Sequence, residues 1–134
     1  MKREVPTLTR AEAEVMQVLW ERERATVHDV VAALPRAVAY TTALTMVRIL
    51  ERKGYLRHEA DPDGGRAYLY LPAIPQSQAR REHVRDLVRR LFSGRPQDLL
   101  AGLVEEEKLG PRELEALRAQ IDARLGPRKK EGKK

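Results

Sequence analysis

The amino-acid sequence predicts a mainly α-helical protein with one small β-hairpin: a winged helix-turn-helix domain followed by a three-helix appendage. Three stretches of different pattern lead to this fold class. Apolar residues follow the helical period up to Gly54, alternate with polar residues from there to Leu71, and return to the helical period after Pro72. Helices, a hairpin and further helices in this order are typical of a winged domain with a helical extension.

The same changes of pattern set the expected domain boundaries. We expect a winged helix-turn-helix domain of a DNA-binding type at residues 1–73, a helical dimerisation domain at residues 74–126 and a disordered basic tail at residues 127–134. A chain of 134 residues is long enough for one small domain with such an appendage.

Two capping signals mark the first two helices. Residues 9–12 (Thr-Arg-Ala-Glu) and 26–29 (Thr-Val-His-Asp) each place a threonine three residues before a carboxylate, the pattern that satisfies the free backbone N–H groups of a helix start. The first helix is expected to run to about Glu23, with Trp20 as a large packing residue near its end, and Pro35 stops the second.

The third helix, predicted for residues 39–54, has a divided surface. Its apolar arc contains Ala43, Met46, Val47 and Leu50. Its opposite side contains Thr41, Thr45, Arg48 and Arg52. We expect Thr41 or Thr42 to cap the first turn through its hydroxyl, and Gly54 to end the helix.

The polar side of this third helix combines hydroxyl and guanidinium groups and holds no carboxylate. These groups bind phosphates, guanine edges and thymine methyls, so the surface suits the major groove of DNA. The alternative is a face that only meets water, because periodicity locates the core without assigning a role to the outer side. The two short helices before it complete a helix-turn-helix arrangement, which favours DNA binding.

A β-hairpin follows the third helix. Residues 55–59 and 67–71 alternate as strands, and residues 61–66 (Asp-Pro-Asp-Gly-Gly-Arg) form the reversal between them. A hairpin in this place is the wing of a winged helix-turn-helix domain. Arg66 lies at its tip, where it either reaches a phosphate or the minor groove or remains a solvated turn residue.

The rest of the chain is helical, with helices predicted at residues 76–92, 96–107 and 111–125. Three short amphipathic helices have too little mutual surface to bury their apolar stripes, and a second copy of the chain would cover them. Packing against the winged domain is the alternative. The residues that we assign to dimerisation are Leu87, Leu91, Leu99, Leu103, Leu114, Leu117 and Ile121.

Composition excludes several classes of protein. The chain has no cysteine, which removes disulfides, thiolate metal sites and thiol redox sensing. It lacks a run of about 18 apolar residues and an apolar leader, so we expect a cytoplasmic protein without membrane insertion. The net charge is +6, but residues 1–72 carry a surplus of only one positive charge and residues 73–134 a surplus of five. The local pattern of charge therefore says more about DNA binding than the total does.

An enzyme is not expected. The three histidines, His28, His58 and His83, lie in three separate predicted elements without a cysteine or a close carboxylate arrangement. Gly64-Gly65 fits a hairpin turn better than a phosphate-binding loop. We therefore predict no catalytic residue, no metal and no cofactor.

The chain resembles the BlaI/MecI penicillinase-repressor family of bacterial transcription regulators. The motifs that carry the resemblance are LTRAEAEVMQVLW (8–20), ATVHDVVAAL (25–34), AYTTALTMVRILERKGYLRHE (39–59), GRAYLYLP (65–72) and LAGLVEEEKLGPRELEALRAQI (100–121). The resemblance implies a homodimeric repressor on a palindromic operator of double-stranded DNA with TACA and TGTA half-sites. It implies Thr41, Thr42, Thr45 and Arg48 as recognition positions.

In the best-known members of this family, a membrane-bound sensor protease responds to β-lactam, and cleavage in the C-terminal helices then loosens the dimer. Their scissile Asn-Phe pair corresponds here to Gly102-Leu103, so proteolytic induction and a link to antibiotic resistance do not follow from the resemblance. The paired cysteines of the copper-responsive relatives are absent.

Two alternatives to an operator-specific repressor released through its C-terminal helices stay open. One is a winged-helix regulator that senses a small molecule or metal directly. The other is a module for non-specific DNA binding or protein interaction, which predicts steep salt dependence without sequence preference.

Overall fold

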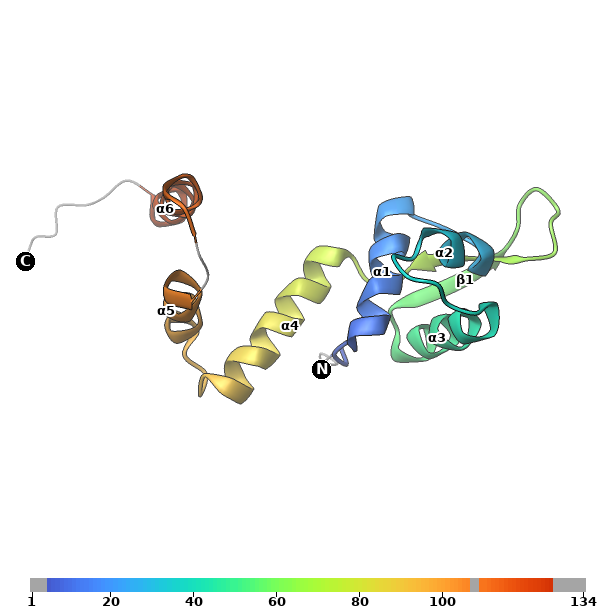
Figure 1. Ribbon diagram of the computed structural model, residues 1–134, viewed down its shortest axis with the longest axis horizontal. Helices are drawn as coiled ribbons and strands as arrows, with labels where there is room; N and C mark the ends of the chain where they lie inside the picture. Colours follow the sequence, from blue (N-terminus) through green and yellow to red (C-terminus); the bar gives the residue numbers. More distant parts are fainter. Residues whose placement is uncertain (1–4, 107–108, 127–134) are drawn as a thin grey trace, which may run out of the picture. The chain divides into compact units, whose positions relative to one another are not determined.

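The computed structural model describes residues 5–106 and 109–126; the tail predicted at residues 127–134 lies outside the described residues. The described elements in chain order are α1 (Arg10–Arg22), α2 (Val27–Ala33), α3 (Tyr40–Lys53), β1 (Leu56–Ala60), β2 (Tyr68–Pro72), α4 (Gln76–Leu91), α5 (Pro96–Glu106) and α6 (Pro111–Leu125) (Figure 1). The fold is mainly helical with one two-stranded antiparallel sheet, as the sequence predicts.

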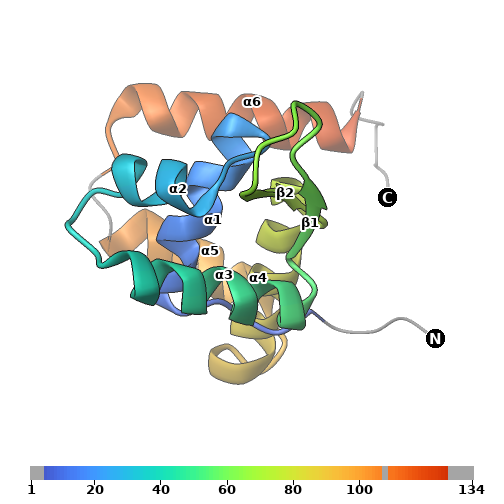
Figure 2. The ribbon, with the colours of Figure 1, turned by 90° about the vertical axis from the view of Figure 1, so that its right-hand side faces the viewer.

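The chain forms two compact units that divide between Leu87 and Val88, inside α4. In the first unit, α1, α2 and α3 pack together with the hairpin. Figure 2 shows α3 running along one face of this unit, with the hairpin rising from its C-terminal end. This is the winged helix-turn-helix arrangement.

Both predicted capping boxes are confirmed. In α1, the Thr9 hydroxyl accepts from the backbone N–H of Glu12, and the Glu12 carboxylate accepts from the N–H of Thr9 at 2.9 Å. In α2, Thr26 and Asp29 make the same reciprocal pair. Reciprocal caps satisfy donors that a helix start would otherwise leave free, so these two boundaries are set by local sequence.

The predicted cap of α3 is wrong. Neither Thr41 nor Thr42 caps the helix, because Ala39 is the N-cap residue and no side chain bonds to the first turn. The helix begins at Tyr40, before either threonine, and this turns both threonines into helical surface positions. The other end follows the prediction: Gly54 has a φ of 93°, a left-handed conformation that glycine adopts without steric cost.

The hairpin pairs β1 with β2 in antiparallel register, from Leu56 opposite Pro72 to Ala60 opposite Tyr68. Each strand starts one residue later than predicted, and Tyr55 is fully buried among the helices instead of joining β1. The predicted reversal is present between the strands. Gly64 there has a φ of 85° and donates its N–H to the carbonyl of Asp61.

The core of the first unit is mainly aliphatic and includes two buried tyrosines, Tyr55 just before β1 and Tyr70 in β2. Its fully buried large side chains are Val15, Met16, Leu19, Val30, Val47, Leu50 and Tyr55. Trp20 covers the edge of this core and donates its indole N–H to the carbonyl of Ile74 at 2.9 Å, which links α1 to the segment just before α4. The predicted apolar arc of α3 faces this core, so its opposite side faces outward.

A buried carboxylate links α1 to the end of α3. Glu12 is the one charged side chain among the described residues that is buried, and Lys53 donates to it at 2.7 Å while also donating to the carbonyl of Thr7. Burial acts to raise the pKa of Glu12, but the hydrogen bonds and charge of Lys53 and the hydrogen bonds of Thr9 outweigh it. The pKa therefore lies below its ordinary value.

Because the pKa of Glu12 is lower in the folded state, its contribution to stability is present above the unfolded pKa and is lost as the pH falls through the folded pKa. We expect Glu12→Gln to reduce the free energy of unfolding by about 1–3 kcal/mol at pH 7, and by less at pH 3. Urea unfolding at the two pH values measures this. Glu14→Gln is the matched control, because Glu14 pairs with the exposed Arg36 and such pairs contribute about 0–1 kcal/mol. Equal losses in both variants would contradict the prediction.

The second unit consists of the end of α4 with α5 and α6. Pro111 stands at the first position of α6, and the backbone N–H of Gly110 before it donates to Glu113 at 3.0 Å. Among the described residues of this unit, Val88 is the sole apolar side chain that is buried. The unit therefore has almost no core of its own.

Candidate nucleic-acid interface

The outward side of α3 carries all five polar residues that the sequence assigned to DNA binding on this helix. They are Thr41, Thr42, Thr45, Arg48 and Arg52, and every one of them is exposed. The helix is held by its buried side, through Ala43, Val47 and Leu50, against the first unit. The polar side is thus presented by a rigid support, which favours accurate contact with a partner.

The hydroxyl of Thr45 is already in use. It donates to the carbonyl of Thr41 one turn earlier, at 3.0 Å. Its proton therefore points back along the helix, and what remains for a partner is the oxygen lone pairs and the methyl group. A methyl group in this place suits the methyl of a thymine.

Two arginines of α3 are the cations available to a partner. In the part of the chain that the structure describes, neither Arg48 nor Arg52 pairs with a carboxylate, whereas Lys53 on the same helix is held by Glu12. Arg57 on the hairpin pairs with Glu59 at 2.7 Å. The structure thus separates cations held in ion pairs from the two arginines of α3.

A cluster of polar side chains joins α3 to the hairpin. The Nδ1 atom of His58 on β1 lies 2.7 Å from a carboxylate oxygen of Glu51, and the His58 ring stacks 5.6 Å from Tyr70. Burial and the charge of Glu51 raise the pKa of Tyr70, against a smaller opposite effect from Arg48. These contacts tie α3 to the hairpin, and the charge of Arg48 acts on Tyr70 at their junction.

Arg66, which the sequence predicts at the tip of the wing, is exposed in the loop between β1 and β2. Figure 1 shows this loop projecting beyond the helices of the first unit. A basic side chain in such a loop is well placed for a phosphate backbone or a minor groove.

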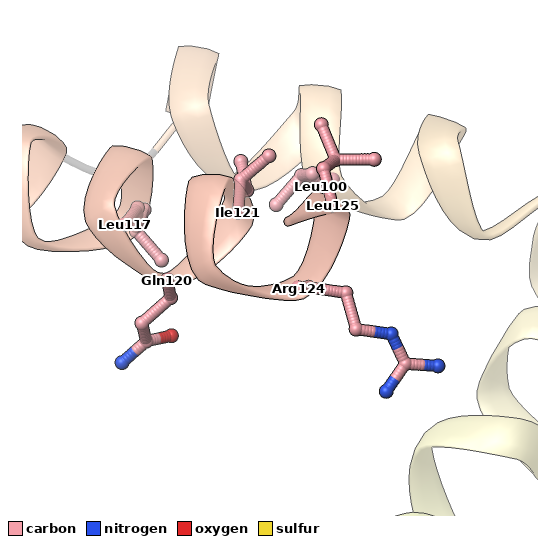
Figure 3. Close-up of a pocket in the computed structure, with 6 residues that line it drawn as sticks. All are labelled: Leu100, Leu117, Gln120, Ile121, Arg124 and Leu125. Atoms are coloured by element: carbon pink, nitrogen blue, oxygen red, sulfur yellow. The ribbon is translucent and has the colours of Figure 1, made fainter. Parts of the chain in front are cut away.

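The residues assigned to dimerisation follow a different pattern. Leu99 and Leu117 are half-buried, and the others are exposed: Leu87, Leu91, Leu103, Leu114 and Ile121. In the second unit, Leu100 of α5 lies with Leu117, Ile121 and Leu125 of α6 along a shallow groove of about 310 Å³. Figure 3 shows Ile121 and Leu125 beside Leu100, with Gln120 and Arg124 pointing away from them.

The candidate cleavage position lies inside a helix. Gly102 and Leu103 are in the middle of α5, with Gly102 half-buried and Leu103 exposed. A protease binds its substrate in an extended conformation, so cleavage there would require α5 to unwind locally.

Sequence reasoning missed one residue pair at this surface. Tyr40, the first residue of α3, lies against His28 of α2 with ring centroids 4.5 Å apart. Tyr40 falls about 100° from Thr41 around the helix, so the polar stripe did not include it. The sequence did hold one signal for this pair. Tyr40 is an aromatic residue at the start of a helix, where no preceding helical turn covers its ring.

Two other features are absent from the described residues. Residues 5–106 and 109–126 hold no group of three His, Cys, Asp or Glu side chains that would suit a metal ion. Over the same residues, no helix combines the length and apolar character needed to cross a membrane.

The fold and this surface define a winged-helix DNA-binding protein. The model of the penicillinase repressor family matches residues 8–123, and the chain belongs to this family, the BlaI/MecI family of repressors. It is 26% identical over 117 residues to the penicillinase repressor of Bacillus licheniformis, covering 86% of this chain and 89% of that one.

One further relative agrees with the family, and one solved structure agrees with the fold. The chain is 23% identical over 113 residues to the methicillin resistance regulatory protein MecI of Mammaliicoccus sciuri, covering 83% of this chain and 89% of that one. The crystal structure of a mutant MarR from E. coli matches with a TM-score of 0.54 at 19% identity, over 89% of this chain and 79% of that one. The second match concerns the fold alone.

Proposed function

We propose that this chain is a repressor that binds a palindromic operator as a homodimer, with α3 in the major groove of each half-site. Membership of a family of repressors supports the regulatory role. The observation that carries the proposal is the outward side of α3, which presents exposed threonines and arginines. The opposite side of the helix packs against the core, and the two arginines pair with no carboxylate of the described residues. The family is one of repressors, and no enzymatic activity is proposed.

A second copy of the chain is the proposed partner of the second unit. Its described residues bury one apolar side chain and leave seven large ones exposed, a composition that is unfavourable in water without a partner. A single winged domain buries about 600–1,000 Å² on DNA, which supports only weak selective binding. Two domains joined through their helical units bind as one ligand, because the second contact is intramolecular.

The same coupling makes the helical units the natural place for regulation. Any signal that separates the two copies lowers operator affinity without touching the DNA-binding surface. Proteolysis in α5 by a membrane-bound sensor protease is one such signal, and it would have to act on a locally unwound Gly102-Leu103. A ligand that binds where the helical units of the two copies meet would act through the same equilibrium between monomer and dimer.

The test is binding of the purified chain to a duplex with a TACA/TGTA palindrome and to a scrambled duplex of equal length, across a salt series near physiological strength. We expect a preference of about a thousandfold or more for the palindrome, with two chains per duplex. Equal affinities that both fall steeply as salt rises would instead indicate a non-specific module and would exclude operator-specific repression at this sequence.

A further inference from the structure

The first turn of α3 carries an aromatic pair. Tyr40 is the first residue of the helix, and its ring lies 4.5 Å from the ring of His28 on α2, centroid to centroid, at an interplanar angle of 38°. Tyr40 is 42% exposed, and His28 is also exposed. One part of the tyrosine therefore rests against α2, and the remainder faces outward.

The pair has hydrogen-bonding groups to spare. Across residues 5–106 and 109–126, the Tyr40 hydroxyl and the two ring nitrogens of His28 take part in no hydrogen bond within the chain. Two other polar side chains of the region are committed, since Thr45 bonds to Thr41 and His58 to Glu51. The pair is thus a donor and acceptor site, and the contact with the tilted His28 ring limits the rotation of Tyr40.

Position along the helix decides which group meets which part of DNA. When a helix-turn-helix domain binds, the N-terminal residues of the second helix contact base edges in the major groove, and the preceding helix crosses the phosphate backbone. Tyr40 occupies the first helical position of α3, and His28 lies in the first turn of α2. A tyrosine hydroxyl hydrogen-bonds equally well to the ring nitrogens, oxygens and amino groups of base edges.

We infer that Tyr40 is a specificity-determining residue whose hydroxyl hydrogen-bonds to one base edge in each half-site, and that His28 is its positioning residue. This inference rests on the proposed function, because it assumes that α3 enters the major groove. It adds a base contact outside the stripe of Thr41, Thr45, Arg48 and Arg52.

The hairpin supplies a matched control. Tyr68 lies against His58 with ring centroids also 4.5 Å apart, at an interplanar angle of 40°, and is 55% exposed. It is the same kind of pair in the same domain, but it lies on β2 instead of at the start of α3. Losing the ring of Tyr68 therefore imitates the loss of an exposed tyrosine that contacts a histidine ring, without removing the proposed base contact.

The experiment measures affinity for an operator duplex and for every single base-pair substitution of one half-site, with wild type, Tyr40→Phe, Tyr40→Ala, His28→Ala and Tyr68→Ala. The duplex is the TACA/TGTA palindrome, or the best sequence selected by the wild-type protein from a random pool. We expect one substitution to weaken the wild type about tenfold and to have almost no effect on either Tyr40 variant. His28→Ala should reduce the discrimination at that same base pair, whereas Tyr68→Ala should leave the profile unchanged.

The outcomes separate the inference from the function on which it rests. If selection yields no preferred sequence, the proposed repressor function fails and the inference fails with it. If a preferred sequence exists and both Tyr40 variants keep the wild-type profile, only the inference fails. A profile lost in Tyr40→Ala but kept in Tyr40→Phe would overturn the hydrogen bond, because the ring alone would then be responsible. We expect equal melting temperatures for Tyr40→Phe and wild type, because the variant loses only the hydroxyl and keeps the ring contact with His28.

Discussion

Ile121→Asp is expected to raise the dissociation constant of the dimer by about a hundredfold or more, and to weaken operator binding with it. Ile121 is 48% exposed in the single chain, so a carboxylate there meets water and leaves α6 folded. In the proposed dimer the same position is covered by apolar side chains of a second copy. A carboxylate at such an interface loses its hydration without gaining a partner, which makes dimerisation unfavourable.

Two measurements test this prediction. Sedimentation equilibrium gives the dissociation constant of the dimer, and titration of the palindromic duplex gives operator affinity at a concentration where the wild type is dimeric. Ala119→Asp is the matched control, since Ala119 is exposed and lies two residues before Ile121, about 200° around α6. Both variants add one negative charge, so a loss confined to Ile121→Asp would depend on the apolar face. A variant that stays dimeric with unchanged operator affinity would contradict the proposal.

Much of the fold follows from local signals. The capping boxes at Thr9 and Thr26 confirm that short patterns fix helix starts, because the groups that satisfy one another lie within three residues. Gly54 ends α3 for an equally local reason, its left-handed conformation. The predicted cap of α3 is wrong because two threonines in sequence offered a cap, and the actual cap, Ala39, uses no side chain.

Contacts between distant parts of the chain could not be predicted from the sequence. Lys53 and Arg52 are adjacent and chemically alike, yet Lys53 is held by Glu12 at 2.7 Å and Arg52 faces outward. Periodicity does not distinguish them, because the partner lies 41 residues away. The contact between His28 and Tyr40 is another case, since the path of the turn between α2 and α3 decides which residues meet. Sequence predicted which face of α3 is polar, and structure showed which groups on it are committed.

Arg48→Ala is expected to weaken operator binding selectively. Arg48 lies in the middle of α3, is exposed, and carries no ion pair within the described residues. In the major groove a guanidinium binds the O6 and N7 atoms of guanine, and loss of such a contact costs about 1–3 kcal/mol per site. We expect operator affinity to fall by about tenfold or more for each half-site, with affinity for random duplex changed only slightly, since a base contact exists on the correct sequence alone.

Arg52→Ala is the matched comparison for Arg48→Ala. Arg52 lies on the same face but in the last turn of α3, where a helix that inserts its N-terminal part is closer to the phosphates than to the bases. We expect its loss to weaken operator and random duplex equally and to reduce the salt slope by about one. Titration of both duplexes at several salt concentrations measures both effects. If Arg48→Ala behaved as Arg52→Ala is expected to behave, Arg48 would be a phosphate contact, and sequence recognition by α3 would have to come from its hydroxyl-bearing residues.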